Sequence, residues 1–328
     1  MTRPAPRRPV GRAAAALAAL AFAGASLAAC TGADDRWVDE LPGTLTIATG
    51  GTTGIYHGYG QALAAVLEDR YGIDVEVLET GGSVENLHLV ADGTADLAFT
   101  AADALEDAAV GRGDFDEPVD VRALARVYDD FEHLVVPAGS DVKDVTDLRG
   151  LRVSTGASRS GTSLIADRVL TAAHVDVTDL QVSELGITES IDALRDGTID
   201  AFFWSGGLRT PGLVELAEEM PLRLVPLADV VDPMRAEHGD GYRHGVVPEG
   251  VYGSTADVET LAVPNVLVVP AGMPDDVAYG LVATLFGNRG TLAGQVPSAA
   301  LLDRTRSIYT APVDLHPGAE RYYRDSKI

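Results

Sequence analysis

The sequence predicts an α/β protein of two similar lobes that face a shared cleft and are joined by two crossings of the chain. Two motifs occur twice: L-x-[IV]-x-T-G at residues 45–50 and 151–156, and D-G-T-x-D at residues 92–96 and 196–200. The copies lie 106 and 104 residues apart, and this nearly shared offset indicates a duplicated unit. Strands and helices also alternate with short loops, as in a mostly parallel sheet flanked by helices. The alternative for D-G-T is a common helix-to-strand turn.

The first lobe is predicted from hydrophobic periodicity and turn residues. Tyr59, Leu63 and Val66 recur at helical spacing, so they predict a helix over 55–71. Ser83 is expected at or near the N-cap of the next helix. The predicted strands are 45–49, 75–78, 97–100, 122–128 and 133–136, and the predicted helices are 55–71, 84–91 and 102–110.

The second lobe repeats this order, and the chain then returns to the first. The predicted strands are one that begins at 151, then 180–182 and 201–203, with helices at about 161–173 and at 187–195. A proline-bracketed strand at 263–270 and a helix at 275–286, with Pro274 at its first position, follow. Crossings near 136–140 and 261–266 would form a hinge for rigid-body closure. The expected lobes are 44–137 plus 264–328, and 138–263.

The N-terminus has the form of an export signal. Four arginines precede an apolar run at 13–27 that ends in Leu27-Ala-Ala-Cys30. Cys30 is the only cysteine, and its context resembles a bacterial lipobox, in which that cysteine is lipidated. We expect a lipoprotein signal peptide over 1–29, cleaved before Cys30, and a tether over 30–43 that anchors the protein outside the cytoplasm. A transmembrane helix fits less well, because the run is short, alanine-rich and broken by Gly24.

Composition and motifs argue against several functions. The net charge of −24 repels nucleic acid and anionic membranes, so membrane contact is expected through the lipid anchor only. Seven histidines without ligand spacing and one cysteine predict no metal site. No catalytic residue is predicted, since no G-x-S-x-G occurs and nothing selects a pair among 49 acidic residues. A dinucleotide cofactor is not expected, because the loop reads G-G-x-x-G rather than G-x-G-x-x-G.

The loops after the two repeated strands are suited to an anion. Gly50 to Gly54 supply glycines and hydroxyls where a helix begins, and Ser160-Gly161-Thr162 does so in the second copy. The first N–H groups of a helix lack intrahelical partners, and the helix dipole favours negative charge there. The sequence therefore predicts that two helix N-termini face one anionic ligand.

An ordered set of motifs resembles the TAXI family, the solute receptors of TRAP-type transporters. The set covers roughly residues 44–324 and is specific as a set, although no single motif is. It comprises Thr49-Gly-Gly-Thr-Thr-Gly-Ile-Tyr56, Gly81-Gly-Ser-Val-Glu-Asn86, Ala102-Asp103, Gly156-Ala-Ser-Arg-Ser-Gly-Thr162, Asp196-Gly-Thr-Ile-Asp200 and Leu315-His-Pro-Gly-Ala-Glu-Arg-Tyr-Tyr-Arg324.

The resemblance implies a type II periplasmic-binding-protein fold, a monomer that is not an enzyme and has no cofactor. It would capture a small carboxylate, a glutamate-like amino acid or a 2-oxo dicarboxylate, for a fused TRAP membrane subunit. A sensory receptor of the same fold, without transport, stays an alternative. The binding residues that it implies are Gly51, Thr52, Tyr56, Ser83, Asn86, Asp103, Ser158, Ser160, Thr162, Trp204, Ser205 and Gly206.

Some of these residues have a structural alternative. Asp103 would accept from an ammonium group, or would cap a helix. Tyr56 and Trp204 would wall the pocket, or belong to the core. The sequence departs from the family pattern at His57, where a second aromatic residue is frequent, and at Arg159, inside the second loop. The identity of the ligand is therefore left open.

Overall fold

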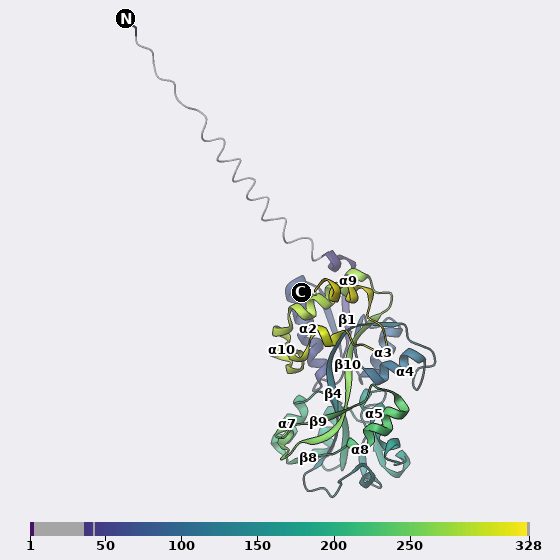
Figure 1. Ribbon diagram of the computed structural model, residues 1–328. Coiled ribbons are helices and arrows are strands. Elements are labelled where there is room, and N and C mark those ends of the chain that lie inside the picture. The colour runs from purple at the N-terminus through teal and green to yellow at the C-terminus, as the bar shows by residue number, and fades with distance from the viewer. Residues whose placement is uncertain (3–35, 42, 327–328) are drawn as a thin grey trace.

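A computed structural model describes residues 1–2, 36–41 and 43–326 of the chain. Two lobes lie end to end, and the long strands β4 (Val121–Pro137) and β10 (Val258–Pro270) run through both (Figure 1). The predicted signal peptide and Cys30 lie outside the described residues. Among the described helices, none is both long and apolar enough to cross a membrane.

The first lobe is built on three parallel strands, each followed by a helix. Strand β1 pairs with β2 and β3, with Leu45 opposite Val75 and Ile47 opposite Leu97. The predicted helices 55–71 and 102–110 are confirmed to the residue. The elements are β1 (Thr44–Ala48), α2 (Ile55–Tyr71), β2 (Asp74–Leu78), α3 (Ser83–Ala91), β3 (Leu97–Ala101) and α4 (Ala102–Val110).

The second lobe repeats the arrangement around β5, which pairs in parallel with β6 and β7. Helix α6 has the predicted bounds. The elements are η2 (Val145–Leu148), β5 (Arg152–Ser154), α5 (Gly161–Ala172), η3 (Val177–Asp179), β6 (Gln181–Ser183), α6 (Ile187–Arg195), β7 (Ala201–Gly206), α7 (Pro211–Glu219), β8 (Leu222–Val225), α8 (Ala228–His238), β9 (Arg243–Val247) and η4 (Val251–Gly253).

The two crossings are the strands β4 and β10. The strand order β2-β1-β3-β10-β4-β7-β5-β6 places them at the centre of one sheet. The expected crossing at 261–266 agrees with β10, which pairs with β9 up to Ala262 and with β3 from Asn265. The first crossing was expected too late: β4 already pairs with β7 at Phe131, so residues 131–137 align with the second lobe. The predicted strands 122–128 and 133–136 are therefore one strand.

The C-terminal elements complete the first lobe. They are α9 (Asp275–Gly287), α10 (Arg289–Gln295), η5 (Pro297–Leu301), α11 (Arg304–Ser307) and α12 (Pro317–Asp325). Pro274 is the N-cap of α9 rather than its first residue. The expected tether also differs: its described part forms η1 (Arg36–Glu40), whose Trp37 is buried against α9 and stacks edge-on with Tyr71 at 5.1 Å. Burial of an indole attaches this segment to the lobe.

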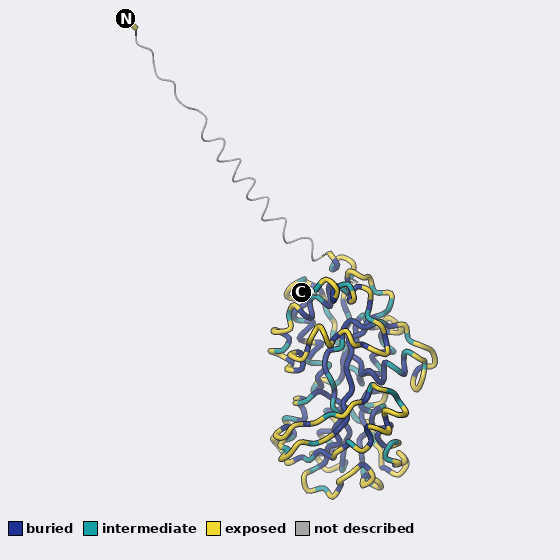
Figure 2. The backbone as a smooth tube through the Cα atoms, viewed as in Figure 1, coloured by how far each residue is buried: buried dark blue, intermediate teal, exposed yellow. Residues whose placement is uncertain are grey.

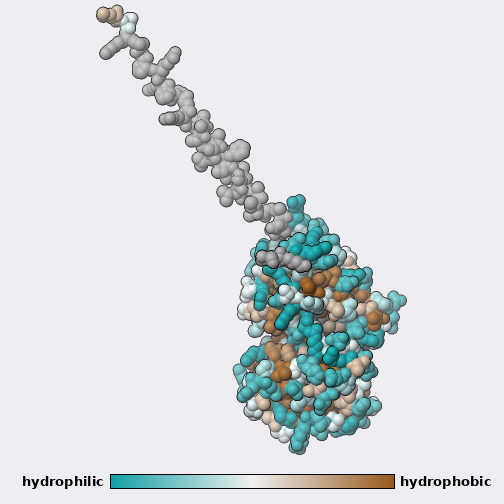
Figure 3. Space-filling view, viewed as in Figure 1, coloured by the Kyte–Doolittle hydropathy of each residue, from teal (hydrophilic) through white to brown (hydrophobic). Residues whose placement is uncertain are grey.

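The buried residues follow the central strands through both lobes (Figure 2). Separate apolar clusters fill the two lobes, and the visible face outside them is largely hydrophilic (Figure 3). Two duplicated lobes, joined by two crossing strands, confirm the expected α/β fold of the type II periplasmic-binding-protein kind. In open α/β sheets, ligands bind outside the carboxyl ends of the strands, which here places the site between the lobes.

Candidate functional site: a cavity between the lobes

A cavity of about 370 Å³ lies between the lobes, where four strand-to-helix loops meet. The loops lead from β1, β2, β5 and β6 into α2, α3, α5 and α6. Its size suits one small organic molecule, which such pockets bury almost completely. Its lining consists of residues 50–51, 54–56, 79–83, 156–157, 160–162, 184–189 and 203–206, together with Ala101, Tyr128 and Asp130.

Four helix N-termini contribute to this lining. The N-caps of α2, α3 and α6 are Gly54, Gly82 and Gly186, which supply no side-chain cap. At α5, Ser160 caps its own helix by accepting from the backbone N–H of Ser163 at 2.9 Å. Backbone N–H groups and four helix dipoles thus point toward one cavity, an arrangement that stabilises negative charge.

Eight residues predicted as binding residues lie on the cavity wall: Gly51, Tyr56, Ser83, Ser160, Thr162, Trp204, Ser205 and Gly206. The remaining four, Thr52, Asn86, Asp103 and Ser158, do not line it. Thr52 and Ser158 are exposed, whereas Asn86 and Asp103 are buried. The structure therefore brings together most of the predicted set and shows what the two buried exceptions contact.

Tyr56 connects the two sides of the first-lobe wall. Its hydroxyl lies 3.2 Å from Ser83 Oγ and donates to the side-chain oxygen of Asn265 on β10. Ser83, expected near an N-cap, is the first residue of α3, and its Oγ accepts from the Ala101 N–H at 3.0 Å. The hydroxyls that line this wall are thus held in place by protein partners.

Asn86 holds loops rather than facing the cavity. Its Nδ2 donates to the carbonyls of Thr49 (2.6 Å) and Phe99 (2.8 Å), and its Oδ1 accepts from Thr80 Oγ1 at 2.6 Å. These bonds tie the loop after β1 to the loop after β2 and to strand β3. Asn86 therefore sets the positions of two cavity loops.

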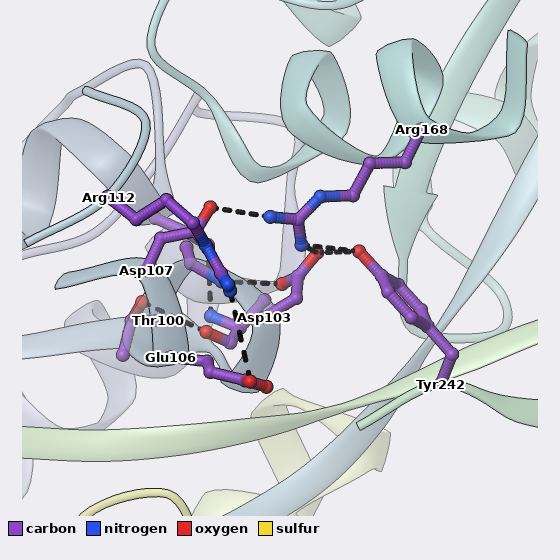
Figure 4. A network of polar contacts seen from close by, with 10 residues as sticks. Thr100, Asp103, Glu106, Asp107, Arg112, Arg168 and Tyr242 are labelled. Carbon is purple, nitrogen blue, oxygen red and sulfur yellow. Dashed lines mark hydrogen bonds and ion pairs between the residues drawn. The ribbon is translucent and has the colours of Figure 1, made fainter. Parts of the chain in front are cut away.

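Asp103 belongs to a buried polar cluster between the lobes, which we call the interlobe clasp: Asp103, Asp107, Arg168 and Tyr242 (Figure 4). Asp103 and Asp107 lie on α4 of the first lobe, whereas Arg168 lies on α5 and Tyr242 precedes β9, both in the second. Arg168 Nη2 is 2.5 Å from Asp107 Oδ2, and its Nη1 donates to the Tyr242 hydroxyl at 2.9 Å. That hydroxyl donates to Asp103 at 2.8 Å. The cluster joins the two lobes.

Further contacts show that the lobes are closed on each other. Thr53 Oγ1 lies 3.1 Å from Thr188 Oγ1, and the Glu85 N–H donates to the Arg159 carbonyl at 3.0 Å. At the start of α5, a Cβ on Gly161 would lie 2.8 Å from Ser83 Oγ, so glycine permits the close approach of α5 to α3. The cavity is thus formed by both lobes together.

The acidic residues of β4 are not among the predicted site residues. Asp130 lines the cavity, is 5% exposed, and has an Oδ1 without a hydrogen-bond partner among the described residues. Glu132, two residues on, is also buried, and neither of its carboxyl oxygens has a partner in the described part of the chain. Their signal in the sequence is the run Asp129-Asp-Phe-Glu132 between apolar segments, where local composition predicts a break between two strands.

Burial changes the protonation of this strand. It raises the pKa of Asp130 to about 7, and it raises the pKa of Glu132 well above its ordinary value, with a further contribution from the charge of Asp130. His133 responds in the opposite sense: burial lowers its pKa to about 4, so it is neutral at physiological pH. Asp130 is therefore poised between its two forms near neutral pH.

The charged side chains of the lining are all acidic. They are Glu79, Asp130, Glu184 and Glu189, and no Lys, Arg or His occurs among the described lining residues. Three of these acids are exposed at the rim, and Asp130 alone of the four is buried. Among the described lining residues, the helix N-termini are therefore the groups that supply positive potential. Within the described ranges, no group of three or more His, Cys, Asp or Glu residues is arranged to hold a metal ion.

Comparison with known proteins places the chain in a family and supports the fold. The model of the NMT1-like family matches residues 47–326. A solved structure of a protein from Bordetella bronchiseptica RB50 is 20% identical, with a TM-score of 0.52 over 84% of each chain. An ancestral arginine-binding protein bound to arginine is 16% identical, with a TM-score of 0.49 over 77% of this chain and 96% of that one. The periplasmic aliphatic sulphonate binding protein of Escherichia coli is 15% identical, with a TM-score of 0.45 over 88% and 84%.

Proposed function

We propose, from the premise that the chain belongs to the NMT1-like family, that it is an extracytoplasmic receptor for a small solute. The observation that carries this proposal is the cavity of about 370 Å³ whose wall is supplied by both lobes. A ligand that contacts both lobes stabilises the closed arrangement, which is how a two-lobed receptor signals that it is loaded.

The solute carries a carboxylate in this proposal. Four helix N-termini provide neutral donors for it, and the hydroxyls of Ser83 from the first lobe and Thr162 from the second line the same cavity. No lining arginine is needed, because several backbone N–H groups and helix dipoles together stabilise an anion. A glutamate-like amino acid and a 2-oxo dicarboxylate both remain members of this class.

The transport role follows from the TAXI resemblance and the N-terminal sequence. We assign the receptor to a TAXI-type TRAP transporter with a fused membrane subunit, and to the outer face of the membrane through lipidated Cys30. The lobe boundaries proposed from the structure are 36–130 plus 264–326 and 131–263, since β4 changes partner at Phe131 and β10 by Asn265.

Calorimetry tests the proposal. The protein from Cys30 onward, carrying Cys30→Ser, retains every described core residue, since the cores begin at Trp37. It is titrated with glutamate, glutamine and 2-oxo dicarboxylates, and freshly purified protein is examined by mass spectrometry for a retained solute. Binding with recovery of unchanged solute supports a receptor. If no carboxylate binds and none co-purifies, the proposed solute class is wrong. If the protein converts the solute into another compound, it is an enzyme rather than a receptor.

A further inference from the structure

We propose that the solute also carries a protonated amino group, and that Asp130 on β4 is its acceptor. This inference rests on the proposed receptor function and narrows its solute class from small carboxylates to amino acids. It concerns a residue that the family resemblance did not single out, because Asp103 was the acid expected to face an ammonium group.

The position of Asp130 carries the inference. It lies where β4 passes between the lobes, it lines the cavity, and its Oδ1 has no hydrogen-bond partner in the described structure. A buried carboxyl oxygen without a partner is unfavourable, and buried polar atoms in native proteins usually have one. Tyr56 and Tyr128 also line the cavity, with their rings edge-on and 6.4 Å apart. A ligand ammonium group would supply the missing partner.

The charges around Asp130 make a cation the matching ligand group. The guanidinium of Arg126 pairs with Asp129 instead, and that of Arg168 belongs to the interlobe clasp. Glu132, with both carboxyl oxygens unpartnered among the described residues, provides no positive charge either, and burial favours its neutral form. A 2-oxo dicarboxylate would bring two negative charges and no donor to this end. An amino acid places its ammonium group at Asp130 and its carboxylate at the helix N-termini.

Protonation supports the geometry and adds a pH dependence. Burial raises the pKa of Asp130 to about 7, and the charges of Asp129 and Asp103 contribute in the same direction. The amide of Asn265 on β10 favours the ionised form. Glu132 and the phenols of Tyr56 and Tyr128 also interact with Asp130, and burial raises the pKa of all three. An ammonium group requires ionised Asp130, so amino-acid affinity should rise between about pH 6 and pH 8.

The experiment compares matched pairs of ligands by calorimetry on the mature Cys30→Ser protein. Each pair shares one side chain: L-glutamate with 2-oxoglutarate, L-leucine with 4-methyl-2-oxopentanoate, and L-phenylalanine with phenylpyruvate. We expect the amino acid of the bound pair to be favoured by about 10- to 100-fold, the range of a charge-assisted hydrogen bond. Asp130→Asn should abolish that preference. The matched control Asp129→Asn removes a carboxylate from the adjacent residue, which lies outside the lining, and should change affinity less than about 3-fold.

The outcomes separate this inference from the receptor proposal. Binding of a 2-oxo acid as tightly as its amino acid, or tighter binding of either by Asp130→Asn, overturns the role of Asp130 but leaves a carboxylate receptor. If 1,4-diaminobutane binds and no carboxylate does, Asp130 keeps its role as the acceptor of an ammonium group, but the proposal that the solute carries a carboxylate is wrong. If no ligand of either kind binds wild-type protein between pH 6 and pH 8, both are wrong.

Discussion

Removing the guanidinium of the interlobe clasp should open the receptor. In Arg168→Met, the long side chain remains but the ion pair with Asp107 and the bond to the Tyr242 hydroxyl are lost. The side chains of Arg168 and Asp107 are 8% and 4% exposed, so both ends of the pair are desolvated in the closed state. In an open state they would be separated and hydrated. The substitution should therefore destabilise the closed state relative to the open state more than it lowers the folding stability of either lobe.

The expected magnitude follows from the partners that stay behind. Removing one partner of a buried ion pair destabilises by about 3–5 kcal/mol, because an uncompensated charge is left buried. Here Asp107 keeps Arg112 at 2.7 Å, and Asp103 keeps the Tyr242 hydroxyl at 2.8 Å. We therefore expect the low side of this range or below it, about 2 kcal/mol, which corresponds to about 30-fold in the ratio of closed to open protein.

Pulsed electron paramagnetic resonance measures this ratio without a ligand. Spin labels at Asp69 on α2 and Glu218 on α7, both exposed, report the distance between the lobes in the Cys30→Ser background. Arg195→Met is the matched control, since Arg195 pairs with Asp192 and Glu219 within one lobe at the surface. Arg168→Met should shift the distribution toward longer distances and the control should not. Identical distributions for wild type and Arg168→Met would refute the reasoning.

Three further predictions concern pH, fluorescence and anchoring. Because the folded-state pKa of Asp130 is about 7 against an ordinary value near 4, the unliganded fold keeps a proton that the unfolded chain releases between these pH values. The free energy of unfolding should therefore fall as the pH rises through this window. In urea unfolding between pH 4 and pH 8, Asp130→Asn should remove on the order of 4 kcal/mol of that fall. If the free energy of unfolding depends on pH in the same way in the variant, the carboxyl group is not buried as described. Trp204 lines the cavity whereas Trp37 packs on α9, so ligand binding should change tryptophan emission in wild type and not in Trp204→Phe. Cys30→Ser should move the protein from the membrane fraction to the soluble fraction, and unchanged retention would exclude the lipid anchor.

The duplicated loops could be predicted because local chemistry and repetition specify them. A β-branched strand, glycines and hydroxyl residues at a helix start are readable in the sequence, and the second copy indicated that both face one cleft. Helices 55–71, 102–110 and 187–195 have the predicted bounds for the same reason. The eight predicted residues on the cavity wall come from these loops and from the end of β7.

The central strand could not be predicted in this way, because its character depends on tertiary pairing. Asp129, Asp130 and Glu132 disfavour a strand on local grounds, yet β4 continues through them by pairing with β10 and then β7. The roles of Asp103 and Asp130 were also not separable from sequence. Both acids follow a predicted strand by two or three residues. Only the positions of Arg168 and Tyr242, 65 residues or more along the chain from Asp103, show that Asp103 is the acid with a cationic and a hydroxyl partner.

The clasp and the acids of β4 act on closure in opposite directions. Across the clasp, Arg168 and Tyr242 stabilise contact between the lobes, whereas closing the cavity desolvates Asp130. A ligand that binds the open and the closed protein equally well would not shift the equilibrium between them. Only the difference between its affinities for the two states changes that equilibrium. On the proposed assignment, the ammonium group interacts with Asp130 fully when water is excluded, so that interaction is strongest in the closed state. On this assignment, the amino group of the ligand would contribute part of the free energy that favours closure. The clasp would keep the free-energy difference between the open and closed states small enough for the binding of one small molecule to reverse it.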